Sequence, residues 1–224
     1  MVPRKTTTRE RLITTAAELF RRQGYTQTGV NQIIQEAGAT SGSFYHFFPA
    51  KQDLLMAVVD HIASVFETEI YAAAADHADE PLEELFEILA LYRKHLRDSG
   101  FAFASPMAAL SAEVSENHPQ VRARLAEIFA DWTGRIEALL DNAGDRLPTT
   151  LDRAALAELI LCATEGAVLG IRLNRSLEPF EAILSQLRIF FDLLEVGKTA
   201  PAPGAVTRRT QHAAPSQSAD WRSW

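Results

Sequence analysis

The stretch from Thr28 to Lys51 constrains the fold of this chain more than any other. Its first half carries apolar residues at spacings of three and four, which predicts a helix with one buried face. Gly38 comes directly after this pattern, and a glycine there commonly ends a helix because it enters the left-handed region at low cost. We therefore expect a helix that the Thr28 hydroxyl caps and that Gly38 ends. The apolar positions are Val30, Ile33, Ile34 and Ala37.

A second, shorter helix is expected directly after the glycine. Thr40 or Ser41 can cap it, and Pro49 ends it because the residue before a proline is pushed out of helical geometry. A helix of about seven residues is unstable alone in water, so packing must hold it. Phe44 and Phe48 lie four residues apart and can anchor one side. The outward face then consists of Gly42, Ser43 and His46, flanked by Tyr45 and Phe47.

A small polar helix face behind a glycine corner is what a helix-turn-helix presents to a DNA groove. These residues resemble the DNA-binding part of the TetR-type (tetracycline-repressor-like) transcriptional regulators over residues 8–60. Two positions depart mildly from the family pattern. Ser41 stands where a basic residue is common, and Gln52 stands where glutamate is common. The matching positions are Thr28, Ala37-Gly38, Thr40, Gly42, Phe44 to Phe48, Lys51 and Leu54-Leu55.

The resemblance implies an all-α fold of about nine helices. An N-terminal three-helix helix-turn-helix domain would precede a C-terminal helical bundle, and the protein would be a homodimer through its last two helices. We expect a DNA-binding domain over residues 1–50, an effector-binding and dimerisation domain over 51–196, and a disordered tail over 197–224. The tail is rich in Ala, Pro, Ser and Thr and lacks periodicity.

The resemblance also assigns a DNA face. Thr28 and Lys51 would contact phosphates, and the short helix would enter the groove. No arginine on that helix can read guanine with two hydrogen bonds, so we expect phosphates and DNA shape to contribute much of the specificity. The alternative is a helix-turn-helix that serves only as packing. The expected DNA-binding residues are Thr28, Thr40, Ser41, Gly42, Ser43, Tyr45, His46 and Lys51.

Charge is divided unevenly along the chain, although the formal net charge is −7. Residues 1–52 carry +4 and residues 197–224 carry +3, whereas residues 53–196 carry −14. A basic end beside an acidic body suits a protein that presents one part to phosphates. The single Cys162 excludes a disulfide within one chain and fits a reducing cytoplasm. No signal peptide and no apolar run of ~18 residues is evident, so we expect a cytoplasmic protein without membrane contact.

Periodicity predicts one further helical segment before Thr28 and six after the short helix. Pro, Gly and Asp residues mark the breaks between them. The expected segments are 7–23, 51–75, 82–97, part of 101–114, 119–140, 153–173 and 179–196.

The last two expected helices carry long apolar faces, and the family usually dimerises through them. Gly166 and Gly170 lie four residues apart and would let two helices approach closely. Four helices, two from each chain, would then form a bundle across a two-fold axis. The alternative is that these faces form only the core of one chain. The expected interface residues are Leu159, Ala163, Gly166, Gly170, Ile183, Leu187, Phe190 and Phe191.

Family members usually bind a small-molecule effector among the middle helices. Each candidate side chain, taken singly, is more often core than pocket. Glu165 is a charge on an apolar helix and needs a partner. A cationic ligand or an arginine such as Arg172 could supply it, and we favour the arginine. The candidate pocket residues are Phe66, Phe86, Tyr92, Phe103, Met107, Trp132, Cys162 and Glu165.

Enzyme chemistry has little support in the sequence. The six histidines show no metal-ligand spacing, no glycine-rich phosphate loop is present, and Cys162 lies in an apolar run where a thiol is usually inert. We expect no cofactor and no metal. The function expected is a repressor that releases a palindromic DNA operator when an unidentified effector binds. The alternative is a helical ligand-binding or scaffolding protein without operator binding.

Overall fold

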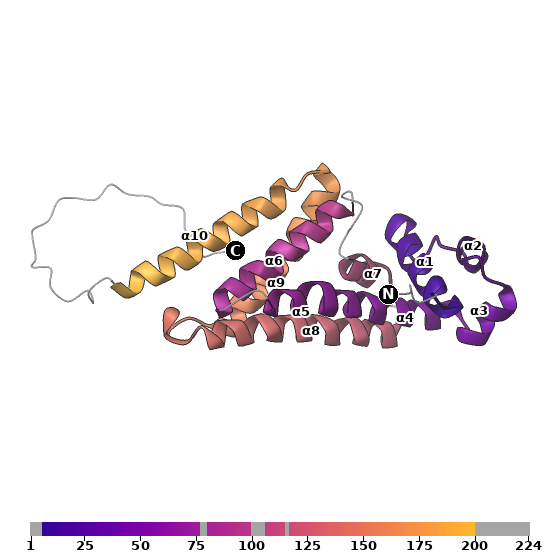
Figure 1. Cartoon of the computed structure of the whole chain (residues 1–224), viewed down its shortest axis with the longest axis horizontal. Helices are drawn as coiled ribbons and strands as arrows, with labels where there is room; N and C mark the ends of the chain where they lie inside the picture. The colour runs from indigo at the N-terminus through magenta and orange to yellow at the C-terminus, as the bar shows by residue number, and fades with distance from the viewer. Residues whose placement is uncertain (1–5, 77–79, 100–105, 115–116, 200–224) are drawn as a thin grey trace, which may run out of the picture.

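The computed structural model describes residues 6–76, 80–99, 106–114 and 117–199, and every regular element within them is helical (Figure 1). Three helices form a compact unit at one end, which we call the head: α1 (Thr8–Gln23), α2 (Val30–Glu36) and α3 (Ser41–Phe47). The rest, which we call the body, is elongated. It consists of α4 (Lys51–Phe66), η1 (Glu67–Tyr71), α5 (Ala72–Ala75), α6 (Pro81–Asp98), α7 (Pro106–Val114), α8 (Pro119–Asn142), η2 (Gly144–Arg146), α9 (Arg153–Asn174) and α10 (Glu178–Thr199).

The expected all-α fold is confirmed, and the helix boundaries agree with the sequence pattern to within a few residues. One difference lies in the expected long helix from Lys51 to Ala75. It is a continuous rod, but η1 is a π-helical turn inserted between α4 and α5. Another lies at the end of the body, where α10 continues to Thr199 and so includes the first residues assigned to the tail. Residues 200–224, with both terminal tryptophans, lie outside the described residues.

Side-chain caps begin several helices where the sequence places a Ser, Thr or Asp. Thr7 and Glu10 form a reciprocal capping box at α1. The Thr40 hydroxyl accepts a hydrogen bond from the Ser43 amide at 3.1 Å, which confirms Thr40 as the cap of α3. At α9, Asp152 accepts from the Ala155 amide at 3.0 Å. These caps fix the start of each helix from local sequence alone.

The head is built around aromatic anchors from α3 and its C-cap. Phe44 and Phe48, four residues apart, are fully buried, as the sequence predicts. They pack with apolar residues of α1 and α2 and with the first turns of α4. Because α3 has only seven residues, this burial holds it in place. The core residues around the anchors include Leu12, Ala16, Leu19, Ile33, Leu54 and Leu55.

In the body, the rod formed by α4 and α5 runs beside α8, α8 packs on α9, and α9 packs on α10 (Figure 1). Among the described residues, α9 is the one helix long and apolar enough to cross a membrane by length and composition. The expectation that no apolar stretch reaches that length is therefore wrong for α9. One side of this helix is core, where Leu156, Ile160, Ala167 and Ile171 are buried, and this packing accounts for much of its apolar composition.

Candidate nucleic-acid interface and effector pocket

The outward face of α3 is exposed and carries most of the residues that the sequence assigns to DNA. Ser41, Gly42 and His46 are exposed, and Tyr45 is 56 % exposed. Ser43 is half-buried, because its hydroxyl lies 2.9 Å from the Thr40 hydroxyl that caps the helix. Hydroxyl, phenol and imidazole groups on this face can donate to phosphate oxygens or to base edges. The face can therefore meet a DNA groove without rearrangement of the head.

A glycine corner sets the angle between α2 and α3. Gly38 has a φ of +58°, a left-handed conformation that glycine adopts without the strain a side chain would bring. The Ala39 amide then donates to the Ile34 carbonyl at 3.0 Å, which closes the end of α2. The chain reverses within three residues and begins α3 at Ser41. The head thus contains the helix-turn-helix that the sequence predicts.

Thr28 does not cap α2, although the sequence predicts that it does. Gly29, not Thr28, is the residue before α2, and the Thr28 side chain makes no cap there. Thr28 is 1 % exposed, and its hydroxyl donates to the Gly24 carbonyl at 2.7 Å. Gln23 donates to the same hydroxyl at 3.2 Å. The Thr28 hydroxyl therefore stabilises the turn between α1 and α2, and a phosphate contact by Thr28 stays a prediction.

Lys51 lies at the start of α4, as expected, but its ammonium is directed into the protein. The Nζ donates to the Tyr25 carbonyl at 2.6 Å and lies 4.1 Å from the centre of the Tyr25 ring. Burial lowers the pKa of Lys51, and the nearby Glu113 carboxylate acts in the opposite direction. An ammonium has three donors, so two remain for another acceptor. A phosphate contact by Lys51 stays a prediction.

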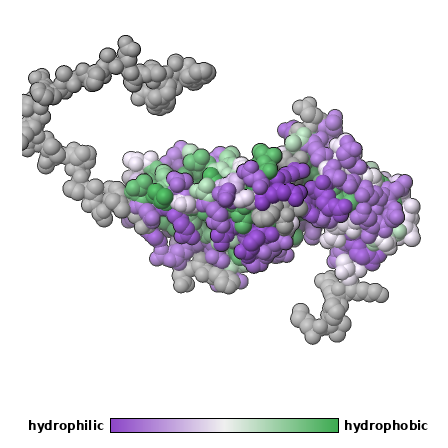
Figure 2. All heavy atoms as spheres, turned by 90° about the horizontal axis from the view of Figure 1, so that it is seen from above, coloured by the Kyte–Doolittle hydropathy of each residue, from purple (hydrophilic) through white to green (hydrophobic). Residues whose placement is uncertain are grey.

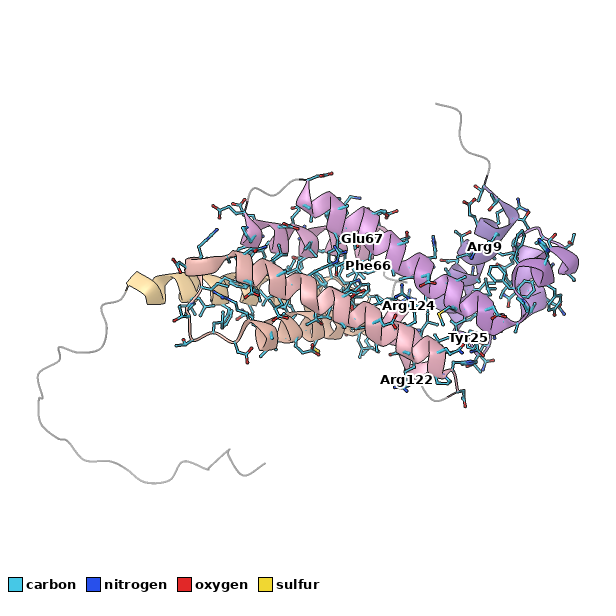
Figure 3. All side chains as sticks on the ribbon, turned by 90° about the horizontal axis from the view of Figure 1, so that it is seen from below. Arg9, Tyr25, Phe66, Glu67, Arg122 and Arg124 are labelled. Atoms are coloured by element: carbon cyan, nitrogen blue, oxygen red, sulfur yellow. The ribbon has the colours of Figure 1, made fainter. Side chains whose placement is uncertain are left out.

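Two arginines of α1 lie beside the helix-turn-helix, and neither is among the expected DNA-binding residues. Arg9 is exposed and lies over the Phe48 ring at 5.5 Å, next to the end of α3 (Figure 3). Arg11 donates from Nε to the Ala37 carbonyl at 3.1 Å and so caps the end of α2. The basic residues near the start of α1 are the sequence signal that could have placed Arg9 among the candidate DNA-binding residues.

One carboxylate of the body touches the head directly. Glu113 in α7 accepts a hydrogen bond from the Thr26 amide at 2.9 Å. Its carboxylate also lies against Gly24, where a Cβ would come within 2.6 Å of Oε1. His118, just before α8, packs edge-on against Tyr25 with ring centres 5.3 Å apart. These contacts join residues about ninety positions apart, so no local sequence pattern identifies them.

The last two helices expose an apolar stripe on the side away from the core. On α9 its members recur at alternating spacings of three and four, as at a helix–helix contact, and Leu173 is 75 % exposed. We call this set, with its neighbours on α10, the outer stripe. Figure 2 shows hydrophobic residues gathered on the body, while the head is mostly hydrophilic. The outer stripe consists of Leu159, Cys162, Gly166, Leu169 and Leu173 on α9, and Ile189, Phe190 and Leu193 on α10.

The outer stripe contains only part of the expected dimer interface. Leu187 and Phe191 are buried within the chain, because they lie on the side of α10 that packs toward the body core. Gly170 also faces inward, since a Cβ there would come within 2.9 Å of the Pro179 Cβ. Ala163 and Ile183 are half-buried. Periodicity predicts apolar faces correctly here but does not reveal which of two faces a neighbouring helix covers.

Four of the expected pocket residues meet in the middle of the body. Phe66, Tyr92, Trp132 and Glu165 line an enclosed cavity of about 30 Å³, together with Tyr71 from η1. The favoured pairing of Glu165 with Arg172 is wrong. The Glu165 carboxylate instead accepts a hydrogen bond from the Tyr92 hydroxyl at 3.3 Å, while Arg172 lies exposed on α9.

The other expected pocket residues lie elsewhere. Phe86 packs edge-on against Phe191 with ring centres 5.8 Å apart, in contact with α10. Cys162 is exposed on the outer stripe, where its thiol lies 3.7 Å from a Glu158 oxygen. Burial and the Glu158 charge raise the pKa of this thiol. Phe103 lies outside the described residues, and Met107 belongs to α7 without a described side chain.

A larger, open cleft lies where the head meets the body, and no sequence pattern predicted it. Its volume is about 450 Å³, and residues of α1, α4 and α6 line it. Phe66 lines both this cleft and the enclosed cavity, so its ring stands between the two. Within the described part of the chain, no three His, Cys, Asp or Glu residues are grouped as a metal site would require.

Comparison with known proteins matches both parts of the chain. Residues 12–58 match the family model for bacterial regulatory proteins of the tetR family. Residues 81–186 match the model for the C-terminal domain of LmrA/YxaF-like transcriptional regulators. An uncharacterised HTH-type transcriptional regulator, Rv0196 of Mycobacterium tuberculosis, is 34 % identical over 187 residues, which cover 80 % of this chain and 92 % of that protein.

Two further similarities extend over most of the chain. The HTH-type transcriptional repressor NemR of Escherichia coli is 26 % identical over 187 residues, which cover 81 % of this chain and 92 % of that protein. The crystal structure of a regulatory protein TetR from Rhodobacter sphaeroides has a TM-score of 0.75 at 26 % identity. That match covers 83 % of this chain and 97 % of the other. The matches span head and body together.

Proposed function

The chain belongs to the TetR family of bacterial regulatory proteins and is a DNA-binding transcriptional regulator, and from this premise we propose that it acts as a homodimeric repressor released by a small-molecule effector. The observation that carries the proposal is the outward face of α3, which is exposed, polar and anchored from behind by two buried phenylalanines. NemR, a similar protein that is named as a repressor, supports repression over activation.

We assign base and groove contacts to the exposed side chains of α3, with Tyr45 and His46 at its centre. Arg9 and Lys51 flank this helix and supply positive charge for phosphates, while the Thr28 hydroxyl stabilises the turn between α1 and α2. Phosphate contacts position a DNA-binding protein and base contacts give it specificity. Because the α3 face carries no arginine, much of the specificity would come from DNA shape.

Dimerisation follows from the small size of the reading helix and from the outer stripe. One seven-residue helix reads too few base pairs for a specific site, so two heads are needed. The outer stripe exposes large apolar side chains on two adjacent helices, which suits a four-helix contact with a second copy. The two α3 helices would then lie ~34–36 Å apart, one turn of the duplex.

Release of DNA requires an effector that binds the two states of the dimer with different affinity. An effector that favours a wider separation of the heads weakens operator binding by that difference in affinity. The ring-lined cavity in the body is the site proposed for it. Residues 1–50 would bind DNA and residues 51–196 would dimerise and sense the effector, in the cytoplasm where the operator is found.

Operator binding by a Tyr45→Ala variant tests the proposal. The probe is a duplex selected by the wild-type protein from a random library, and binding is measured by gel shift. Loss of the exposed phenol should weaken binding roughly 10–100-fold, equivalent to about 1–3 kcal/mol, while the protein stays dimeric. Asn142→Ala, at the body end away from the head, is the matched control. Unchanged binding by Tyr45→Ala would refute the assignment of the DNA face.

A further inference from the structure

Resting on the proposed function, we propose that the effector is an organic cation. Its positive charge would lie among the rings of Phe66, Tyr71, Tyr92 and Trp132 and against the carboxylate of Glu165. Nothing in the family match fixes the effector, and the proposal concerns its chemical class.

The four rings line one small volume. Phe66 stacks on Trp132 with ring centres 4.6 Å apart and an interplanar angle of 26°, and it meets Tyr92 edge-on at 5.1 Å. Tyr71 lies 6.5 Å from Trp132. All four side chains are buried. The face of an aromatic ring carries partial negative charge and attracts a cation, most strongly when water is excluded.

A carboxylate lies in the same wall as the rings. Glu165 lines the cavity, and Tyr92 donates to its Oε1 at 3.3 Å. Burial raises the pKa of the Tyr71 phenol, and among the charges nearby the Glu165 carboxylate adds to this rise while Arg135 opposes it. The residues that line the cavity contribute one carboxylate and no cation, although Arg135 lies 4.9 Å from the centre of the Tyr71 ring. Taking a carboxylate into apolar surroundings costs free energy, and a cationic ligand offsets that cost.

The backbone beside the cavity departs from regular helix. Residues Glu67–Tyr71 form a π-helical turn, which brings Ile70 and Tyr71 into the cavity wall. Such turns are rare and frequently occur at functional sites. A π-turn also holds an extra residue relative to an α-helix, so reversion to α geometry would shift Tyr71 and change the shape of the cavity. This segment supplies a physical means by which the cavity could adapt to a ligand.

Space for a ligand larger than the present cavity lies next to it. The cavity holds about 30 Å³, whereas the cleft on the other side of Phe66 holds about 450 Å³. Figure 3 shows Phe66 in the middle of the body, on α4. Rotation of this one ring would join the two volumes into a site of the size that drug-sized ligands occupy.

The long-range charge of the body also favours a cation. Residues 53–196 contain 25 Asp or Glu and eleven Lys or Arg, so this part of the chain carries −14. Such a field raises the local concentration of positively charged molecules. An anionic effector would meet both this field and the Glu165 carboxylate. The residues that line the cavity offer a cation several aromatic rings and one carboxylate, so the cation is the best match.

Ligand entry through the cleft would act directly on the head. One wall of the cleft is α1, through Thr14, Ala17, Glu18 and Arg21, and the other walls belong to α4 and α6. A ligand that displaces Phe66 into the cleft would therefore press on α1, which is part of the head. This arrangement links occupancy of the cavity to the separation of the two heads.

The test compares phenyltrimethylammonium with tert-butylbenzene, its uncharged isostere. The full-length protein carries Trp221→Phe and Trp224→Phe, so that its fluorescence reports Trp132 alone. Phenyltrimethylammonium should quench Trp132 with a Kd at least tenfold below that of tert-butylbenzene. Glu165→Gln should raise the Kd for the cation at least tenfold and leave the Kd for the isostere unchanged. Glu158→Gln, exposed on the same helix, is the matched control.

If the protein with Glu165 intact bound the two probes equally, or did not bind the cation, the proposal would be overturned. The same preparations are assayed for operator binding. Intact operator binding with no preference for the cation would defeat the cation assignment and leave the regulator function standing. Loss of operator binding in the otherwise wild-type chain would count against the proposed function instead. Release of the operator by the cation, abolished in Glu165→Gln, would support both.

Discussion

The head and the body use opposite kinds of surface. The head presents a polar helix face that Phe44 and Phe48 anchor from behind, and residues 1–52 carry +4. The body carries −14, exposes an apolar stripe on α9 and α10, and encloses a ring-lined cavity. A polar basic surface suits a charged duplex, whereas an apolar surface suits a second copy of the chain.

The surface of the head depends on residues close together in the sequence, whereas the surfaces of the body depend on contacts between distant residues. The surface of the head depends on caps, a glycine corner and two phenylalanines within about twenty residues. The surfaces of the body depend on which side of a helix its neighbours cover, and those neighbours come from distant parts of the chain. Substitutions that separate an anchor from an exposed neighbour test this contrast directly.

The largest effect is expected from removal of a head anchor. Phe44 is 0 % exposed, and Phe44→Ala should destabilise the head by about 3–5 kcal/mol because it leaves a cavity beneath α3. Operator binding should be lost while the body stays folded and dimeric. Urea denaturation and gel shift measure both effects. Phe47→Ala is the control, since this neighbour is 38 % exposed and its loss should cost below about 1 kcal/mol.

Two charges on the outer stripe should separate the dimer. Leu169→Glu with Leu173→Glu removes two exposed leucines, each contributing about 1.5–3 kcal/mol when buried against a partner. We expect monomers of unchanged helicity by sedimentation and circular dichroism. Ala126→Glu with Ala130→Glu, at exposed positions of α8, adds the same charge without touching the stripe. Intact dimers of the α9 variant would show that the stripe is not the interface.

These two predictions separate features that the sequence predicts from features that it does not predict. The anchors of α3, the Thr40 cap and the Gly38 corner could be predicted, because each depends on residues within one or two helical turns. The burial of Leu187 and Phe191 could not, since adjacent faces of α10 are both apolar and only α9 and the body core decide which one is covered. Leu169, Leu173 and Ile189 follow the same periodicity and were missed for the same reason.

Local pattern also misplaced single polar groups. Thr28 stands one residue before Gly29, the N-cap of α2, yet its hydroxyl donates to the Gly24 carbonyl across the preceding turn. Lys51 opens α4 as expected, but the Tyr25 carbonyl attracts its ammonium. Glu165 was assigned to Arg172 by proximity along one helix, although Tyr92 from α6 reaches it. Each partner is fixed by tertiary packing, which spacing along the chain does not record.

The two glycines of α9 should respond oppositely to substitution by alanine, with smaller changes in stability. Gly170→Ala would bring a Cβ within 2.9 Å of Pro179, and such overpacking costs about 1–3 kcal/mol against a gain of about 1 kcal/mol in helix propensity. Gly166→Ala meets nothing within 4 Å in the chain and should gain about 1 kcal/mol. We expect Gly170→Ala to lower the midpoint of urea denaturation, and Gly166→Ala to raise it for the monomer but to weaken the dimer. The same midpoint for both variants would contradict this assignment.

The smallest effect on stability is expected at the contact between head and body. Glu113→Gln replaces the carboxylate that accepts from the Thr26 amide, and the loss should be about 1 kcal/mol or less because the contact is exposed. Its effect should appear instead in the head, as faster hydrogen exchange of the Thr26 amide and an altered operator affinity. Asp145→Asn, at the far end of the body, is the control. Unchanged exchange at Thr26 would show that the contact does not hold the head.

The most direct test of the central claim is the salt dependence of operator binding together with its stoichiometry. If two heads present α3 and the flanking cations to one duplex, two chains should bind each operator. The logarithm of the binding constant should then fall with the logarithm of salt concentration with a slope of about −4 or steeper, as expected for about four or more phosphate contacts. One chain per duplex, or an affinity that does not change with salt, would contradict the account.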